Sequence, residues 1–90
     1  MRVSEAGTPV NLSASAQVSA GAGDLVGVLC ASVSGGTVKV WNNSAASGAV
    51  MCNTYTPVAG TSLPMPGEFN VGLYVTITGT ADITVFYKPR

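Results

Sequence analysis

Apolar and polar residues alternate with a period of two along much of this chain. In the stretch from Leu73 to Thr78, Leu, Val and Ile occupy the odd-numbered positions, while Tyr, Thr and Thr occupy the even-numbered ones. Successive side chains of a β-strand point to opposite faces, so this pattern predicts a strand with one buried face. No window of about eleven residues has the 3.6-residue period of an amphipathic helix. We therefore expect almost no helix.

Similar runs recur along the chain and are separated by Gly, Asn, Pro and Ser clusters that favour turns. We predict strands over Asn11–Ala20, Asp24–Val33, Thr37–Asn42, Gly48–Thr56, Asn70–Thr78 and Asp82–Lys88, with a further short strand near Thr61–Met65. Short strands with turns at this spacing are typical of an antiparallel β-sandwich or a small barrel. The sequence therefore predicts an all-β fold.

Glycines and prolines indicate how these strands connect. A turn at residues 34–36, Ser-Gly-Gly, separates two of the predicted strands, and residues 79–81, Gly-Thr-Ala, predict the turn of a hairpin that closes the fold. Pro64 and Pro66 lack the backbone donor that a central strand needs, so their segment is expected to be an edge strand or an extended loop. Residues 1–9 are expected to form an extended arm, and residues 10–90 a single β-sandwich domain.

Charge is scarce in this sequence of 90 residues. Charged residues make up 9% of the chain, against about 25% in an average soluble domain, and the net charge is zero. Nucleic-acid binding needs clustered Lys and Arg, which this chain lacks, so we expect no nucleic-acid partner. There is no histidine, the commonest general base and metal ligand, and we expect neither enzymatic activity nor a cofactor or metal. A neutral surface with few charges instead favours association.

The two cysteines, Cys30 and Cys52, each lie within an apolar run. Two buried free thiols are one interpretation, and a disulfide between neighbouring strands is the other. No apolar segment approaches the roughly 20 residues that span a bilayer, so no membrane association is expected. The first residues do not resemble a secretory signal, and we expect synthesis in the cytoplasm.

Trp41 is the main candidate for a contact residue among the aromatics. The alternation places it on the strand face opposite Val38 and Val40, together with Lys39. Interfaces are enriched in aromatic residues and depleted of charge, so this tryptophan is expected to cover a sheet edge or an oligomer interface. The alternative is a platform that stacks on sugar rings, which predicts that Trp41 clusters with Tyr74 or Tyr55 on an exposed face.

The order and spacing of several blocks resemble those of small structural proteins of tailed bacteriophages. The blocks are residues 22–28 (Ala-Gly-Asp-Leu-Val-Gly-Val), residues 37–43 (Thr-Val-Lys-Val-Trp-Asn-Asn), Gly48, the Pro57–Pro66 segment, and residues 72–85 (Gly-Leu-Tyr-Val-Thr-Ile-Thr-Gly-Thr-Ala-Asp-Ile-Thr-Val). The resemblance covers residues 21–87. It implies a virion component with a jelly-roll-like β-sandwich of six to eight short strands, and it supplies no catalytic residues.

The resemblance implies a capsid decoration (cement) protein on the outer capsid surface, with the major capsid protein as its partner. Such a protein stabilises contacts between major capsid proteins, and we expect it to act as a homotrimer, with a dimer as the alternative. The other function it implies is a head-fibre or tail adhesion module that binds a host glycan or receptor. The candidate residues for capsid or oligomer contacts are Arg2, Val3, Pro9, Trp41 and Tyr55.

Overall fold

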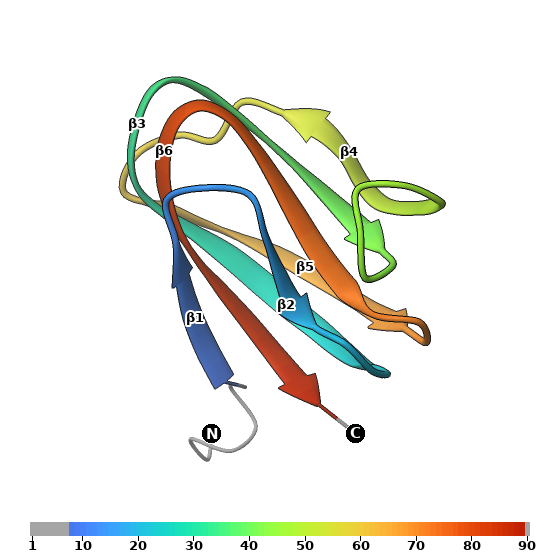
Figure 1. Cartoon of the computed structure of the whole chain (residues 1–90). Helices are drawn as coiled ribbons and strands as arrows, with labels where there is room; N and C mark the ends of the chain where they lie inside the picture. Colours follow the sequence, from blue (N-terminus) through green and yellow to red (C-terminus); the bar gives the residue numbers. More distant parts are fainter. Residues whose placement is uncertain (1–7, 90) are drawn as a thin grey trace.

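The computed structural model of the chain describes residues 8–89, with the side chains of residues 65 and 66 excepted. These residues form one antiparallel sheet of six strands (Figure 1). The strands are β1 (Thr8–Leu12), β2 (Ala16–Ser19), β3 (Gly23–Asn42), β4 (Ala49–Tyr55), β5 (Thr61–Phe69) and β6 (Leu73–Pro89). Residues 8–89 contain no helix. The all-β, antiparallel prediction is therefore confirmed.

Two long strands, β3 and β6, run through the centre of the sheet and pair with each other along most of their length. Residues 23–30 of β3 pair on their other side with β5, and residues 38–42 pair with β4. On the outer side of β6, residues 83–87 pair with β1 and residues 73–75 pair with β2. The edges of the sheet are thus β1, β2, β4 and β5. Pro64 lies on one of these edges, as its missing backbone donor predicted.

The predicted breaks at residues 34–36 and 79–81 are bends within the continuous strands β3 and β6. The prediction of a hairpin that closes the fold is therefore wrong. The segments before and after Gly79 do not pair with each other, because both pair with β3. The two bends lie opposite each other, with Gly35 facing Thr80 across a register shift. Gly35 and Gly79 have φ values of 69° and 80°, which only glycine adopts without strain. Each strand therefore changes direction at a glycine and keeps its ladder, as at a β-bulge.

The predicted strand over Asn11–Ala20 is also wrong, since it consists of two strands, β1 and β2, that pair with different parts of β6. Between them, the Ser15 hydroxyl accepts a hydrogen bond from the Ile77 backbone N–H at 2.8 Å and donates to the Ile77 carbonyl at 3.3 Å. A side chain thus replaces the ladder where the chain passes from one strand to the next. Thr8 and Pro9 belong to β1, so of the expected arm only residues 1–7 lie outside the described residues.

One hydrophobic core is shared by the parts of the sheet on both sides of the bends. The fully buried residues with the largest side chains are Phe69, Leu73, Ile83, Val38, Val40, Val75 and Val85. Leu73 and Val75 lie before the bend of β6, and Ile83 and Val85 lie after it. The alternating positions that predicted one buried face therefore supply the core from both parts. Within the described residues, no buried side-chain nitrogen or oxygen lacks a hydrogen-bond partner.

Candidate functional site

An aromatic row crosses the outward face of β2, β6, β3 and β4. Gln17 pairs with Tyr74, Tyr74 with Trp41, and Trp41 with Val50. Directly opposite residues of neighbouring strands project from the same face of a sheet. The neighbouring positions Val40 and Val75 are fully buried, so this row faces away from the core. We call the outward surface formed by Gln17, Lys39, Trp41, Val50, Tyr74 and Thr76 the Trp41 face.

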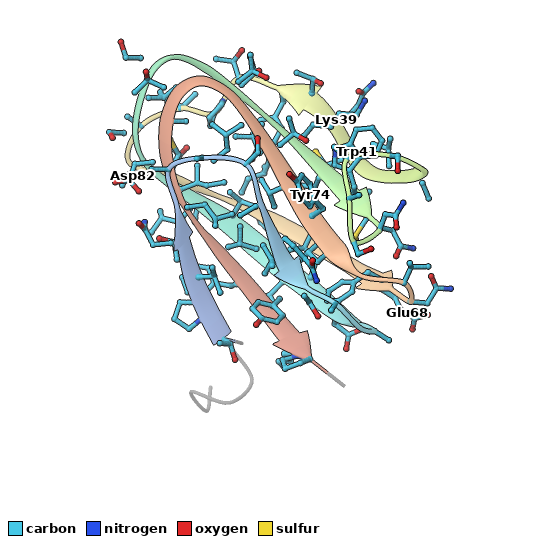
Figure 2. The ribbon with its side chains drawn as sticks, viewed as in Figure 1. Lys39, Trp41, Glu68, Tyr74 and Asp82 are labelled. Carbon is cyan, nitrogen blue, oxygen red and sulfur yellow. The ribbon has the colours of Figure 1, made fainter. Side chains whose placement is uncertain are left out.

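The Trp41 ring is held by two contacts with side chains of this face. Its Nε1–H donates a hydrogen bond of 2.9 Å to the hydroxyl oxygen of Thr76 on β6. The Lys39 ammonium lies 4.3 Å from the ring centroid, within the range of a cation–π contact. Figure 2 shows Lys39 beside Trp41, with Tyr74 on the neighbouring strand. An aromatic side chain that is already oriented loses less entropy when a partner binds, so the Trp41 ring is preorganised for contact.

The Trp41 face carries one positive charge and, among the described residues, no carboxylate. Asp24 lies near the start of β3, Glu68 on β5 and Asp82 after the bend of β6. The bends separate all three carboxylates from the part of the sheet that carries the Trp41 face. Figure 2 shows Glu68 and Asp82 away from Lys39. A half-exposed tryptophan and tyrosine beside a single cation offer stacking area, a few hydrogen-bonding groups and one ammonium. This combination suits contact with another molecule's surface.

The residues that the sequence analysis proposed for capsid or oligomer contacts do not lie together in the described part of the structure. Trp41 lies at the centre of the outward face, as the alternation predicted. Tyr55 pairs with Val38 and packs against the core, so it does not join Trp41. Pro9 is exposed on β1 opposite Phe86, in the other part of the sheet. Arg2 and Val3 lie outside the described residues.

The structure gives Trp41 side-chain contacts with Thr76 and Lys39, and its neighbours across the sheet are Tyr74 and Val50. Of the two clusters that the sugar-platform alternative allowed, the one with Tyr74 is present and the one with Tyr55 is absent. Alternation places Tyr74 and Thr76 on the outward face of their own strand, so part of the signal was in the sequence. Which residues lie beside Trp41 depends on the register between β3 and β6, which alternation alone does not specify.

A cavity of about 280 Å³ opens between β3, β5 and the segment that follows β4. Its lining is formed by Val28, Cys30, Tyr55, Thr56, Pro57, Val58, Thr61, Ser62 and Leu63. Cys30 is buried and Cys52 is half-buried, and both thiols are free, so the structure has no disulfide between them. The Cys30 thiol donates to the Ser32 carbonyl oxygen at 3.4 Å. The cavity is thus apolar apart from hydroxyl and thiol groups.

The Tyr55 phenol is expected to ionise only at strongly alkaline pH, and its ionisation is expected to lower the free energy of unfolding there. Burial, with a smaller contribution from the Cys52 and Cys30 thiols, raises the pKa of Tyr55 from 10.0 to about 12. The protonated phenol is favoured in the folded state, so its contribution to stability is complete below pH 10 and is lost as the pH rises from 10 towards 12. We therefore expect Tyr55→Phe to lose less stability than the wild type over this interval.

Phenolate absorbance and urea unfolding, each measured across that pH interval, test this prediction. The control is Tyr55→Phe itself at neutral pH, where the wild type has no phenolate at this position. The Tyr55→Phe variant should lack the latest-ionising step of the wild type. An absorbance titration that is unchanged by this substitution would contradict the assignment.

No clustered metal site or membrane-spanning helix is found in the described part of the chain. No group of three or more His, Cys, Asp or Glu side chains in that part could hold a metal ion. Among the same residues, no helix has the length and apolar character needed to cross a membrane. No protein-family model, curated protein or solved structure matches the chain. The bacteriophage resemblance therefore stays a prediction from the sequence blocks, and the function must be argued from the Trp41 face.

Proposed function

We propose that the chain is a capsid decoration protein of a tailed bacteriophage, which binds the outer capsid surface and stabilises contacts between major capsid proteins. The observation that carries the proposal is the Trp41 face, where Trp41 and Tyr74 lie side by side on an outward surface with one cation. Large aromatic side chains with a polar group are enriched among the residues that dominate interface energies. The scarcity of charge in the chain agrees with a surface that functions by contact.

We further propose that the bent sheet is a jelly-roll β-sandwich. The bends divide β3 and β6 into two halves each, which gives two sets of neighbouring strands. One set consists of β1, the end of β6, the start of β3, and β5. The other set is β2, the start of β6, the end of β3 and β4. Two four-stranded sets of this kind correspond to the eight strands of a jelly roll. A shared core and a smallest dimension of 16 Å between Cα positions support two layers packed about 10 Å apart.

In the proposed role, Trp41 inserts into the capsid surface and the surrounding side chains exclude water from it. The Lys39 ammonium adds attraction to a shell surface that carries carboxylates, since this face has none of its own among the described residues. Many copies on one shell add binding area, and each copy that bridges neighbouring shell subunits gains from multivalency. Stabilisation of the capsid then requires no reaction.

Trp41→Ala is expected to weaken binding to capsids that lack the protein by about thirtyfold, the loss typical of a residue worth roughly 2 kcal/mol at an interface. Occupancy of purified heads, measured by co-sedimentation over a range of protein concentrations and seen by electron microscopy, tests it. Trp41→Phe should retain much of the affinity because it keeps a ring in the row. Val71→Ala is the matched control, since Val71 is 53% exposed and lies in the turn between β5 and β6, outside the Trp41 face.

Unchanged occupancy of heads by a folded Trp41→Ala protein would contradict the proposal that this face binds the shell. Circular dichroism of each variant establishes that the sheet is intact. Tailed-phage heads that never take up the wild-type protein would contradict the decoration role as a whole.

An adhesion module that binds a host glycan is the second candidate, and the Trp41–Tyr74 pair is the observation that favours it. Sugar rings stack on exposed aromatic faces, and Gln17 and Thr76 lie nearby as hydrogen-bonding groups. Lys39 already lies over the Trp41 ring, so a sugar has to displace it, which is why we place this function second. Saturable binding on a glycan array that Trp41→Ala abolishes, without uptake by heads, would favour the adhesion role.

A further inference from the structure

The four edges of the sheet differ in how they are protected against pairing with another strand. Edge strands expose unpaired backbone groups, and proline, charge or short length commonly blocks their association. β1 contains Pro9, β5 contains two prolines and Glu68, and β2 has only four residues with a register shift. β4 has seven residues, Ala-Val-Met-Cys-Asn-Thr-Tyr, with neither proline nor charge, and its pairing with β3 shifts register twice. It is the longest edge strand of the described chain that has no proline and no charge.

We propose that β4 pairs with β4 of a second copy of this chain, in antiparallel orientation about a two-fold axis at Cys52. The strand runs from Ala49 to Tyr55, and Cys52 is its central residue. Antiparallel pairing about this centre places Ala49 opposite Tyr55 of the second copy and Cys52 opposite Cys52. This register uses the full strand, whereas any shift leaves backbone groups unpaired at both ends.

A second copy is the occupant that β4 fits, because the strand is complementary to itself. Both members of the pair are uncharged, so no ion has to be desolvated when the edges meet. Val50 is 44% exposed at this edge and loses exposed apolar surface if a neighbouring edge approaches. Free backbone groups of β4 on the side away from β3 are satisfied by the same groups of its copy.

Pairing through β4 favours a dimer over the homotrimer expected from the sequence resemblance. An isologous contact uses the same surface on both subunits, so once two copies have paired no β4 edge remains for a third. Val50 belongs to both the Trp41 face and β4, and in this register it lies opposite Thr54 of the second copy, so the aromatic rows of the two copies are offset along the paired edges. The dimer then presents two Trp41 faces, which extends the proposed function without being required by it.

Oxidative cross-linking tests the register. Diamide takes two electrons and two protons from two thiols, forms one disulfide and is itself reduced to the hydrazine. Wild-type protein treated at alkaline pH should give a non-reducing band at twice the 9.0 kDa of one chain. Cys30→Ser should retain this band, because Cys30 is buried away from the β4 edge, and Cys52→Ser should abolish it.

Two variants lacking Cys52 make the register test specific. In the pairing proposed, Met51 of one copy lies opposite Asn53 of the other. A mixture of Met51→Cys/Cys52→Ser with Asn53→Cys/Cys52→Ser should therefore form more cross-linked dimer than either variant alone, with Cys30→Ser included in both. Equal yields from the mixture and the single variants would overturn the register.

Molar mass in solution tests the dimer without covalent chemistry. Light scattering at increasing concentration should reach twice the chain mass for the wild type, and Thr54→Lys should remain monomeric because it places a charge on the edge. Thr8→Lys, on the exposed edge strand β1, is the matched control and should still dimerise. A concentrated wild type that stays monomeric, a trimer, or a dimer that Thr54→Lys leaves intact would overturn the proposal. Head binding is measured separately with Trp41→Ala, so failure of the dimer and failure of the decoration role are distinguishable.

Discussion

Gly79→Ala is expected to lower the free energy of unfolding by about 2–5 kcal/mol, which is a large part of the stability of so small a domain. Two costs add at this bend. Gly79 has a φ of 80°, a conformation that costs an L-residue about 1–2 kcal/mol. A Cβ at this position would lie 2.5 Å from the carbonyl oxygen of Gly35 on the paired strand, and relieving such overpacking costs about 1–3 kcal/mol.

Two other glycines separate these costs. Gly35, at the same corner, has a φ of 69° but no atom within 4 Å of a new Cβ, so Gly35→Ala should show the conformational cost alone. Gly21 has open space and no positive φ, and Gly21→Ala should be nearly neutral. Urea unfolding of the three variants measures the series. If Gly79→Ala were no more destabilising than Gly35→Ala, the close approach of the two bends would be wrong.

Phe69→Ala is expected to destabilise the protein by about 3–5 kcal/mol, the usual cost of removing a buried phenylalanine ring. Phe69 is 0% exposed at the end of the edge strand β5. Its ring packs against the backbone of Gly23, where a new Cβ would lie 2.6 Å from Phe69 Cζ. The ring thus fills the space that a glycine leaves on the paired strand, and its loss opens a cavity that the rigid sheet cannot close.

The same unfolding measurement, with Val71→Ala as control, tests the role of Phe69. Val71 is 53% exposed two residues further along the chain, so its truncation should change stability by less than about 0.5 kcal/mol. Phe69→Leu should recover part of the loss because it retains apolar volume. A cost for Phe69→Ala as small as that of Val71→Ala would mean that the ring is not part of the core.

The proposed dimer contact through β4 and the proposed capsid contact through the Trp41 face involve different residues of neighbouring strands. Val50 alone belongs to both surfaces. A Thr54→Lys monomer that still binds heads with reduced avidity would show that the dimer contributes through multivalency, because one Trp41 face then replaces two. The two surfaces can therefore be varied independently.

The strand character of this chain and the direction of its side chains followed from the sequence alone. Alternation correctly placed Val38 and Val40 in the core and Trp41 on the outside, because the two-residue period of a strand is a local property of the backbone. The edge position expected from Pro64 was also correct, since a missing N–H has the same consequence in any sheet. Scarce charge and the absence of histidine were likewise evident from composition.

Only the tertiary structure decided what the glycines at residues 35 and 79 do and which side chains meet. A glycine with positive φ allows either a chain reversal or a bend. Here the ladder between β3 and β6 continues past both glycines, so each strand bends at its glycine and does not reverse. The register of that ladder sets Tyr74 beside Trp41, and the separate ladder between β3 and β4 pairs Tyr55 with Val38 on the core side. Register is a property of paired strands distant in sequence, so the energy that selects it comes from burial of the shared core and is not encoded in any single segment.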